Sequence, residues 1–97
     1  STRSFPWVMK TILESGKDHS VIRLDVFPGK RCLITSKKKA ERMILVIDGK
    51  AEVFISQKNR ILKRGDGHTV MNNSAIRIEN IGDDTLRLLE VGLFRQH

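Results

Sequence analysis

Residues 42–55 decide the fold, and they read Arg42-Met43-Ile44-Leu45-Val46-Ile47-Asp48-Gly49-Lys50-Ala51-Glu52-Val53-Phe54-Ile55. The dipeptide Asp48-Gly49 separates two apolar segments and suits a tight type I′ turn. After that turn, Ala51, Val53 and Ile55 recur at every second position, which is typical of a half-buried β-strand. The stretch therefore predicts a β-hairpin with strands at 43–47 and 51–55.

The flanking sequence also has the pattern of short strands. Ile22, Leu24 and Val26 alternate with charged residues, and no segment shows a helical period. Other turn-forming groups recur at short intervals: Pro28-Gly29, Lys58-Asn59, Gly65-Asp66-Gly67, Asn72-Asn73-Ser74 and Gly82-Asp83. Short strands punctuated in this way indicate an all-β sandwich or barrel. With 97 residues there is room for one small core, so we expect residues 1–97 to form a single domain.

Composition narrows the classes of partner. No run of about 18 apolar residues exists, so we expect a soluble chain with no membrane partner. Cys32 is the single cysteine, which excludes an intrachain disulfide and favours a cytoplasmic, reducing compartment. A net charge of +7 favours anionic partners without choosing among them. The chain opens at Ser1 without methionine, so we expect a module of a longer protein.

Two sets of positions keep fixed spacings: Gly29, Thr35, Lys37, Arg42 and Gly49, then Gly65, Met71, Asn73, Ile76 and Asn80. These gaps match the two motifs of the cupin superfamily, G(X)5HXH(X)4E(X)6G and G(X)5PXG(X)2H(X)3N. The resemblance implies a small cupin: a double-stranded β-helix, or jelly-roll barrel, made of two antiparallel sheets.

Three stretches resemble one branch of the cupins more closely: Phe5-Pro6-Trp7, residues 38–53 and Ile76-Arg77-Ile78-Glu79-Asn80. They are similar to the C-terminal cupin domain of the bifunctional mannose-1-phosphate guanylyltransferase/mannose-6-phosphate isomerase family. The sequence departs from that pattern at Val8, Met71 and Asn73, where the family has glycine, proline and glycine. Together the three stretches span nearly the whole chain.

The metal ligands of the family are replaced. Where the motifs have two histidines, a glutamate and a third histidine, this chain has Thr35, Lys37, Arg42 and Ile76. Divalent metals need a neutral imidazole, a carboxylate or a thiolate, so we expect no metal and no cofactor. The isomerase activity that the resemblance implies uses a metal to polarise the sugar carbonyl. We therefore expect no catalytic residues, and an isomerase or epimerase with an atypical site is the alternative.

Cationic side chains at the emptied positions suit an anion. We expect a ligand-binding site of Thr35, Lys37, Arg42 and Arg77 for the phosphate or acidic group of a sugar phosphate or nucleotide sugar. In a structural alternative, the lysines at 37–39 form a solvated turn and Arg42 pairs with an acid such as Glu41 or Glu52. The predicted function is thus a metal-free, non-catalytic binding or assembly module.

Segment 43–47 is apolar on both faces, so something must cover its second face. If Arg42 points into the barrel, then Met43, Leu45 and Ile47 point outward. Packing within the chain would cover them, and so would a homodimer interface, which we favour. A dimerisation domain, as in the metal-lacking cupin of the centromere protein C family, is therefore a further functional alternative.

Three other features carry weaker predictions. His68 is interpreted as an exposed loop residue, with general-base catalysis as the alternative. Cys32 is interpreted as a small core residue. Basic clusters at 37–39 and 58–64 lack interleaved aromatic residues, so we expect weak, salt-sensitive nucleic-acid binding at most.

Overall fold

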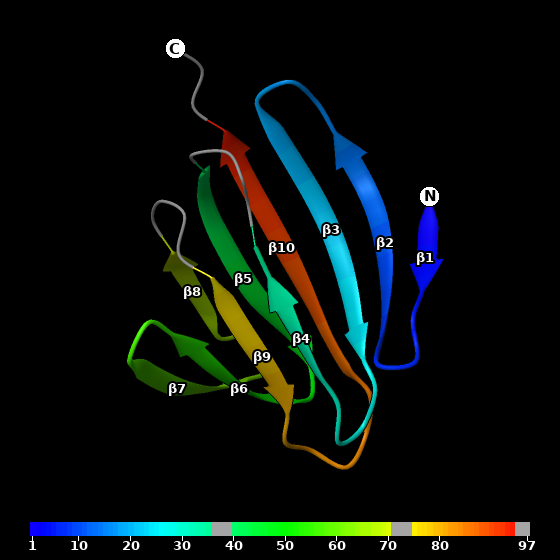
Figure 1. Cartoon of the computed structure of the whole chain (residues 1–97), viewed down its shortest axis with the longest axis vertical. Coiled ribbons are helices and arrows are strands. Elements are labelled where there is room, and N and C mark those ends of the chain that lie inside the picture. The colour runs from blue at the N-terminus through cyan, green and yellow to red at the C-terminus, as the bar shows by residue number, and fades with distance from the viewer. Residues whose placement is uncertain (36–39, 71–74, 95–97) are drawn as a thin grey trace.

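A computed structural model describes residues 1–35, 40–70 and 75–94. Within these ranges the chain forms ten β-strands in two antiparallel sheets that face each other (Figure 1). The prediction of an all-β jelly roll of two antiparallel sheets is confirmed. None of the described residues forms a helix that is long and apolar enough to cross a membrane.

The larger sheet has six strands in the order β1-β2-β3-β10-β5-β8. Its strands are β1 (Thr2–Ser4), β2 (Val8–Ser15), β3 (His19–Val26), β5 (Ala40–Asp48), β8 (Gly67–Val70) and β10 (Leu86–Phe94). The central strand, β10, lies between β3 and β5 and runs antiparallel to both.

The smaller sheet has four strands in the order β4-β9-β6-β7. Its strands are β4 (Arg31–Ile34), β6 (Lys50–Ile55), β7 (Lys58–Lys63) and β9 (Ile76–Asn80). It covers part of one face of the larger sheet, leaving β1 and the outer part of β2 beyond it, and the opposite face of the larger sheet stays uncovered by any described strand (Figure 1).

The core lies between the sheets and follows from period-2 alternation on each strand. Inward side chains include Ile44 and Val46 from β5, and Leu86 and Leu88 from β10, all almost completely buried. The four-stranded sheet contributes Ala51, Val53, Leu62, Ile76 and Ile78. Burying such side chains stabilises the fold by about 1.5–3 kcal/mol each.

The predicted hairpin at Asp48-Gly49 is wrong. β5 pairs with β10 and β8, whereas β6 pairs with β7 and β9, so the turn carries the chain from one sheet to the other. Gly49 has φ +102°, and a Cβ there would lie 3.1 Å from the Cα of Leu86. Asp-Gly favours a sharp change of chain direction, but it does not decide which strands pair. β5 and β6 bury their apolar residues in the same core from opposite sides, so they belong to different sheets.

The two-residue hairpin occurs one strand later, between β6 and β7. Ile55 lies opposite Lys58, and Ser56 in the connecting turn has φ +55°. The turn predicted at Lys58-Asn59 is therefore wrong by two residues, because those residues begin β7.

Asn80, the last position of the second motif, holds one end of the barrel together. Its side-chain Nδ2 donates hydrogen bonds to the backbone oxygens of Val26 and Asp84, both at 2.8 Å, and its Oδ1 accepts from Gly82 N at 3.0 Å. A buried amide satisfied in this way ties the β9–β10 connection to the end of β3.

Candidate functional site

The structure describes three of the four positions at which the metal ligands are replaced, and these three side chains lie in different surroundings. Ile76 is fully buried among the core side chains, and Arg42 points inward with 3% of its surface exposed. Thr35 follows β4 and lines a cavity at the mouth of the barrel. Lys37 lies outside the described residues.

The buried charge of Arg42 faces Glu90 on the neighbouring strand. Arg42 lies opposite Gly92 in the β5–β10 ladder, so Glu90 is on the same inward face two residues along β10. Burial raises the pKa of Glu90, and the positive charges of Arg42 and Lys10 oppose that rise. The acids considered from the sequence face outward instead, and Glu52 accepts a hydrogen bond from Asn59 Nδ2 at 2.7 Å.

A cavity of about 310 Å³ runs along the side of the barrel, between β2 and β3 of one sheet and β4 of the other, from Thr35 at this end to Trp7 beside Phe27 at the opposite end. We call it the barrel-mouth cavity. Its walls are Phe5, Trp7, Val8, Lys10, Leu24, Cys32, Leu33, Ile34, Thr35 and Glu90. Within the described chain, Glu90 Oε2 is buried here without a hydrogen-bond partner. A buried carboxylate oxygen in that state is costly unless a ligand or water donates to it.

Two other groups define the chemistry of the barrel-mouth cavity. Lys10 lies opposite Leu24 on the inward face of β2 and adds a positive charge. Burial, reinforced by the negative charge of Glu90, raises the pKa of the Cys32 thiol to about 11. The thiol therefore stays protonated at neutral pH and is a poor nucleophile, in agreement with its interpretation as a core residue.

An aromatic pair stands at the rim. The rings of Phe5 and Trp7 are stacked with centroids 5.3 Å apart, yet 38% and 43% of their surfaces remain exposed. An exposed indole beside polar groups is a surface on which a flat or weakly polar ring can pack.

Arg77 lies apart from this cavity. It points outward from β9, with its guanidinium 4.2 Å from the ring centroid of Phe54 and its Nε 3.2 Å from Glu79 Oε2. The structure therefore does not bring Arg77 together with Arg42 and Thr35, because neighbouring residues of a strand point to opposite faces.

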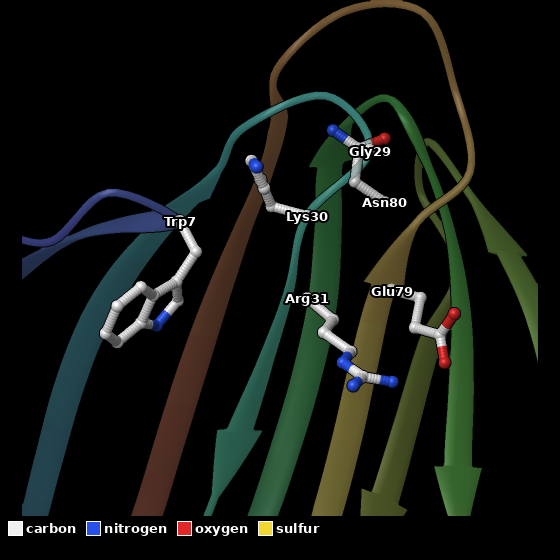
Figure 2. A pocket seen from close by; sticks show the side chains of 6 residues that line it. All are labelled: Trp7, Gly29, Lys30, Arg31, Glu79 and Asn80. Carbon is white, nitrogen blue, oxygen red and sulfur yellow. The ribbon is translucent and has the colours of Figure 1, made fainter.

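A second, more open cavity of about 430 Å³ adjoins Trp7. Figure 2 shows its lining residues Trp7, Gly29, Lys30, Arg31, Glu79 and Asn80. Arg31 lies directly opposite Glu79 in the β4–β9 ladder, so an acid stands beside its positive charge. This cavity is therefore a weaker anion site than its two basic residues suggest.

The residues present do not fit the divalent metal of the cupin motifs. No group of three histidine, cysteine, aspartate or glutamate side chains comes together in residues 1–35, 40–70 and 75–94. The barrel-mouth cavity offers two metal-capable side chains, Glu90 and a Cys32 that stays a thiol. A lone carboxylate does not hold a metal of this kind.

Sequence reasoning missed Glu90 and Lys10. In β10, Leu86, Leu88 and Glu90 recur at every second position, so a charged residue on an otherwise apolar face was the available signal. Lys10 carried no comparable signal, because the alternation in β2 is weak and half of that strand is exposed.

The two facing antiparallel sheets and the motif frame from Gly29 to Asn80 define a cupin domain. Residues 2–95 match the family described as mannose-6-phosphate isomerase C-terminal, and the chain belongs to that family. The resemblance inferred from the sequence is therefore confirmed. No curated protein matches the sequence.

Solved structures with the same fold are distant in sequence. The cupin domain of Schizosaccharomyces pombe Cnp3 has a TM-score of 0.85 at 15% identity, over 98% of this chain and 69% of that one. KdgF from Halomonas has a TM-score of 0.80 at 15% identity, over 99% and 88%. A predicted oxalate decarboxylase from Thermotoga maritima has a TM-score of 0.80 at 21% identity, over 91% and 81%. At these identities the likeness shows the fold alone.

Proposed function

We propose that this cupin is a non-catalytic module that binds a phosphorylated sugar in the barrel-mouth cavity. The observation that carries the proposal is the buried Glu90 Oε2, which accepts no hydrogen bond within the described chain. A sugar hydroxyl would donate to that oxygen, since polyols supply donors that a phosphate group alone does not.

The neighbouring groups supply the rest of such a site. Lys10 offers a point charge for a phosphate oxygen, Thr35 a hydroxyl, and Trp7 an apolar ring face for the sugar. In this proposal Arg42 does not bind the anion. Its positive charge instead stabilises the buried carboxylate of Glu90. Lys37, proposed from the sequence as a further ligand, remains part of this proposal.

The absence of catalysis is proposed from the same residues. Cys32 is a thiol with a pKa of about 11, and His68 bonds to Arg60 outside this cavity. Glu90 is left without a partner base or nucleophile among the described lining residues. Binding without turnover is therefore the expected behaviour.

Calorimetric titration with mannose 6-phosphate, GDP-mannose and inorganic phosphate tests the proposal. We expect saturable heat with the sugar phosphate, lost in Glu90→Gln and in Lys10→Gln and retained in the control Lys50→Gln, whose side chain is exposed elsewhere. No heat at millimolar ligand contradicts binding. Conversion of the aldose phosphate to its ketose, followed by proton NMR, would contradict the non-catalytic part and favour the isomerase alternative.

A second candidate function is homodimerisation through the outer face of the six-stranded sheet. Met43, Leu45 and Ile47 point outward as predicted, 47%, 38% and 41% exposed, and no described segment covers them. β10 extends this apolar face, since Leu89 lies opposite Leu45 and Val91 opposite Met43. Packing within the described chain, the alternative cover for these side chains, is absent.

The charges at the two ends of this face suit a second copy. Arg87, whose Nε lies 3.6 Å from Asp25 Oδ1 but whose side chain stays half exposed, lies at one end of β10, and Glu41 lies opposite Leu93 at the other. A two-fold axis perpendicular to the strands would bring Arg87 of one copy against Glu41 of its partner. A standard interface of this kind buries about 800 Å² on each side.

Light scattering at tens of micromolar protein tests the dimer. We expect twice the monomer mass, reduced to the monomer mass by Leu45→Glu with the fold intact. Ile61→Glu is the matched control, because Ile61 is also exposed but lies on β7 of the other sheet. A monomeric wild-type protein contradicts the proposal.

A further inference from the structure

A cavity of about 540 Å³ lies at the edge of the sandwich, where β7 ends the smaller sheet and β8 ends the larger one (Figure 1). We call it the edge cavity. Its walls are Val53, Ile55, Gln57, Lys58, Asn59, Arg60 and His68. It shares no described lining residue with the barrel-mouth cavity, so it is a separate site.

The edge cavity is basic. Lys58, Arg60 and His68 line it, and none of its described lining residues is acidic. Two acids of nearby segments are already hydrogen-bonded: Glu52 accepts from Asn59, a residue of the cavity wall, and Asp66 accepts from the backbone nitrogen of Lys63 at 2.8 Å. The positive charges are therefore not neutralised by carboxylates in the cavity wall.

Arg60 on β7 and His68 on β8 are held together across the two sheets, so His68 is a half-buried strand residue and the interpretation as an exposed loop residue is wrong. The guanidinium NH1 of Arg60 lies 3.1 Å from the imidazole Nδ1 of His68. Because a guanidinium only donates, Nδ1 must accept, which assigns the ring proton to Nε2. The contact therefore leaves the Nε2 of His68 available to donate, and it places the Arg60 cation beside an imidazole ring rather than a carboxylate.

The remaining wall is apolar. Val53 is buried and Ile55 half-buried, and both reach the cavity from β6. A concave site of this size, with an apolar wall and a few converging donors, has the composition of small-molecule sites.

We propose that the edge cavity binds the phosphate monoester group of a small organic molecule. Arg60 donates bidentately to two phosphate oxygens, Lys58 supplies a point charge, and the Nε2–H of His68 donates to the third oxygen. Val53 and Ile55 contact the apolar part of the molecule. A phosphate monoester suits this set better than a carboxylate, because it offers three terminal oxygens to three donor groups.

NMR titration of the intact chain with phenyl phosphate tests the proposal, with inorganic phosphate and phenol as comparison ligands. We expect a saturable shift of the His68 ring signals, tighter binding of phenyl phosphate than of inorganic phosphate, and no shift with phenol. Arg60→Gln should weaken phenyl phosphate binding about tenfold or more, because a hydrogen bond to a charged group is lost. Arg60 is exposed, so the variant should stay folded.

The control is Arg64→Gln, which removes the same charge from an exposed turn outside the cavity and should leave binding unchanged. Lys10→Gln should also leave it unchanged, which separates this site from the barrel-mouth cavity. Equal weakening by Arg60→Gln and Arg64→Gln would overturn the proposal, as would the absence of any His68 shift. Displacement of phenyl phosphate by a short single-stranded oligonucleotide, with both arginine variants equally impaired, would point to diffuse nucleic-acid binding instead.

Discussion

The two ends of the barrel interior are built from different chemistry. At the closed end, Leu86, Leu88 and Ile78 are completely buried, and Asn80 satisfies its own polar groups within the fold. At the mouth, Arg42 and Glu90 are nearly as buried, yet a Glu90 oxygen has no hydrogen-bond partner in the described chain.

This difference shows where the sequence favours stability and where it does not. Apolar burial at the closed end stabilises the fold directly, whereas desolvating two charges at the mouth costs about as much as their attraction returns. Residues that keep such a costly arrangement are candidates for function rather than for structure. The predictions below change each end in turn and compare the consequences.

The largest effect on the free energy of unfolding is expected when one member of the Arg42–Glu90 pair is replaced. Arg42→Met leaves Glu90 buried with less compensation and should lower the free energy of unfolding by about 4 kcal/mol at neutral pH. Urea denaturation measures it. A loss below about 1 kcal/mol would mean that Arg42 does not compensate Glu90.

A slightly smaller effect is expected at the closed end. Leu88→Ala removes a completely buried side chain from β10 and should cost about 3 kcal/mol by leaving a cavity. Since Leu88 does not line the barrel-mouth cavity, ligand binding by the folded variant should be unchanged. Loss of binding at temperatures where Leu88→Ala is fully folded would contradict the separation of the two ends.

The pH dependence of stability should come partly from the mouth. Because burial raises the pKa of Glu90 above its ordinary value of 4.5, the folded protein holds this proton more tightly than the unfolded chain. The contribution of Glu90 to stability is therefore fully present below pH 4.5 and is lost as pH rises through the folded pKa. Denaturation at a series of pH values should show this loss in the wild type and not in Glu90→Gln, and identical profiles would count against it.

The smallest expected effect concerns the rate at which the Cys32 thiol reacts, and it does not involve stability or ligand binding. With a pKa of about 11 against an ordinary 9.0, Cys32 has about 100-fold less thiolate than an unperturbed cysteine at neutral pH. Alkylation of the native protein should be at least that much slower than alkylation of the unfolded chain. Comparable rates would show that the thiol is neither buried nor raised in pKa.

The sequence predicted the faces of β5 correctly and its partners wrongly. Period 2 and the motif frame together placed Arg42 inward and Met43, Leu45 and Ile47 outward, because alternation is a local property of a strand. β5 pairs with β8 and β10, and its partners in β10 lie from 39 positions (Asp48 to Arg87) to 54 positions (Ala40 to Phe94) away along the chain, so a local Asp48-Gly49 signal carries no information about such a pairing.

The candidate site was predicted less completely for the same reason. Thr35 does line the barrel-mouth cavity, but Glu90 and Lys10 come from strands outside both motifs. They reach the cavity through the sheet register, in which Glu90 lies opposite Ile22 and Ile44, and Lys10 opposite Leu24. Residues brought together by long-range pairing cannot be found by motif spacing, although the charge of Glu90 on an apolar face was a usable sign.

The double variant Arg42→Met/Glu90→Leu tests the central claim, that the mouth keeps its charges for binding and not for stability. Measured on one preparation, its free energy of unfolding at neutral pH should equal or exceed that of the wild type, while calorimetric titration with mannose 6-phosphate should show no binding. A double variant as unstable as Arg42→Met alone, or one that binds the sugar phosphate like the wild type, would contradict the account.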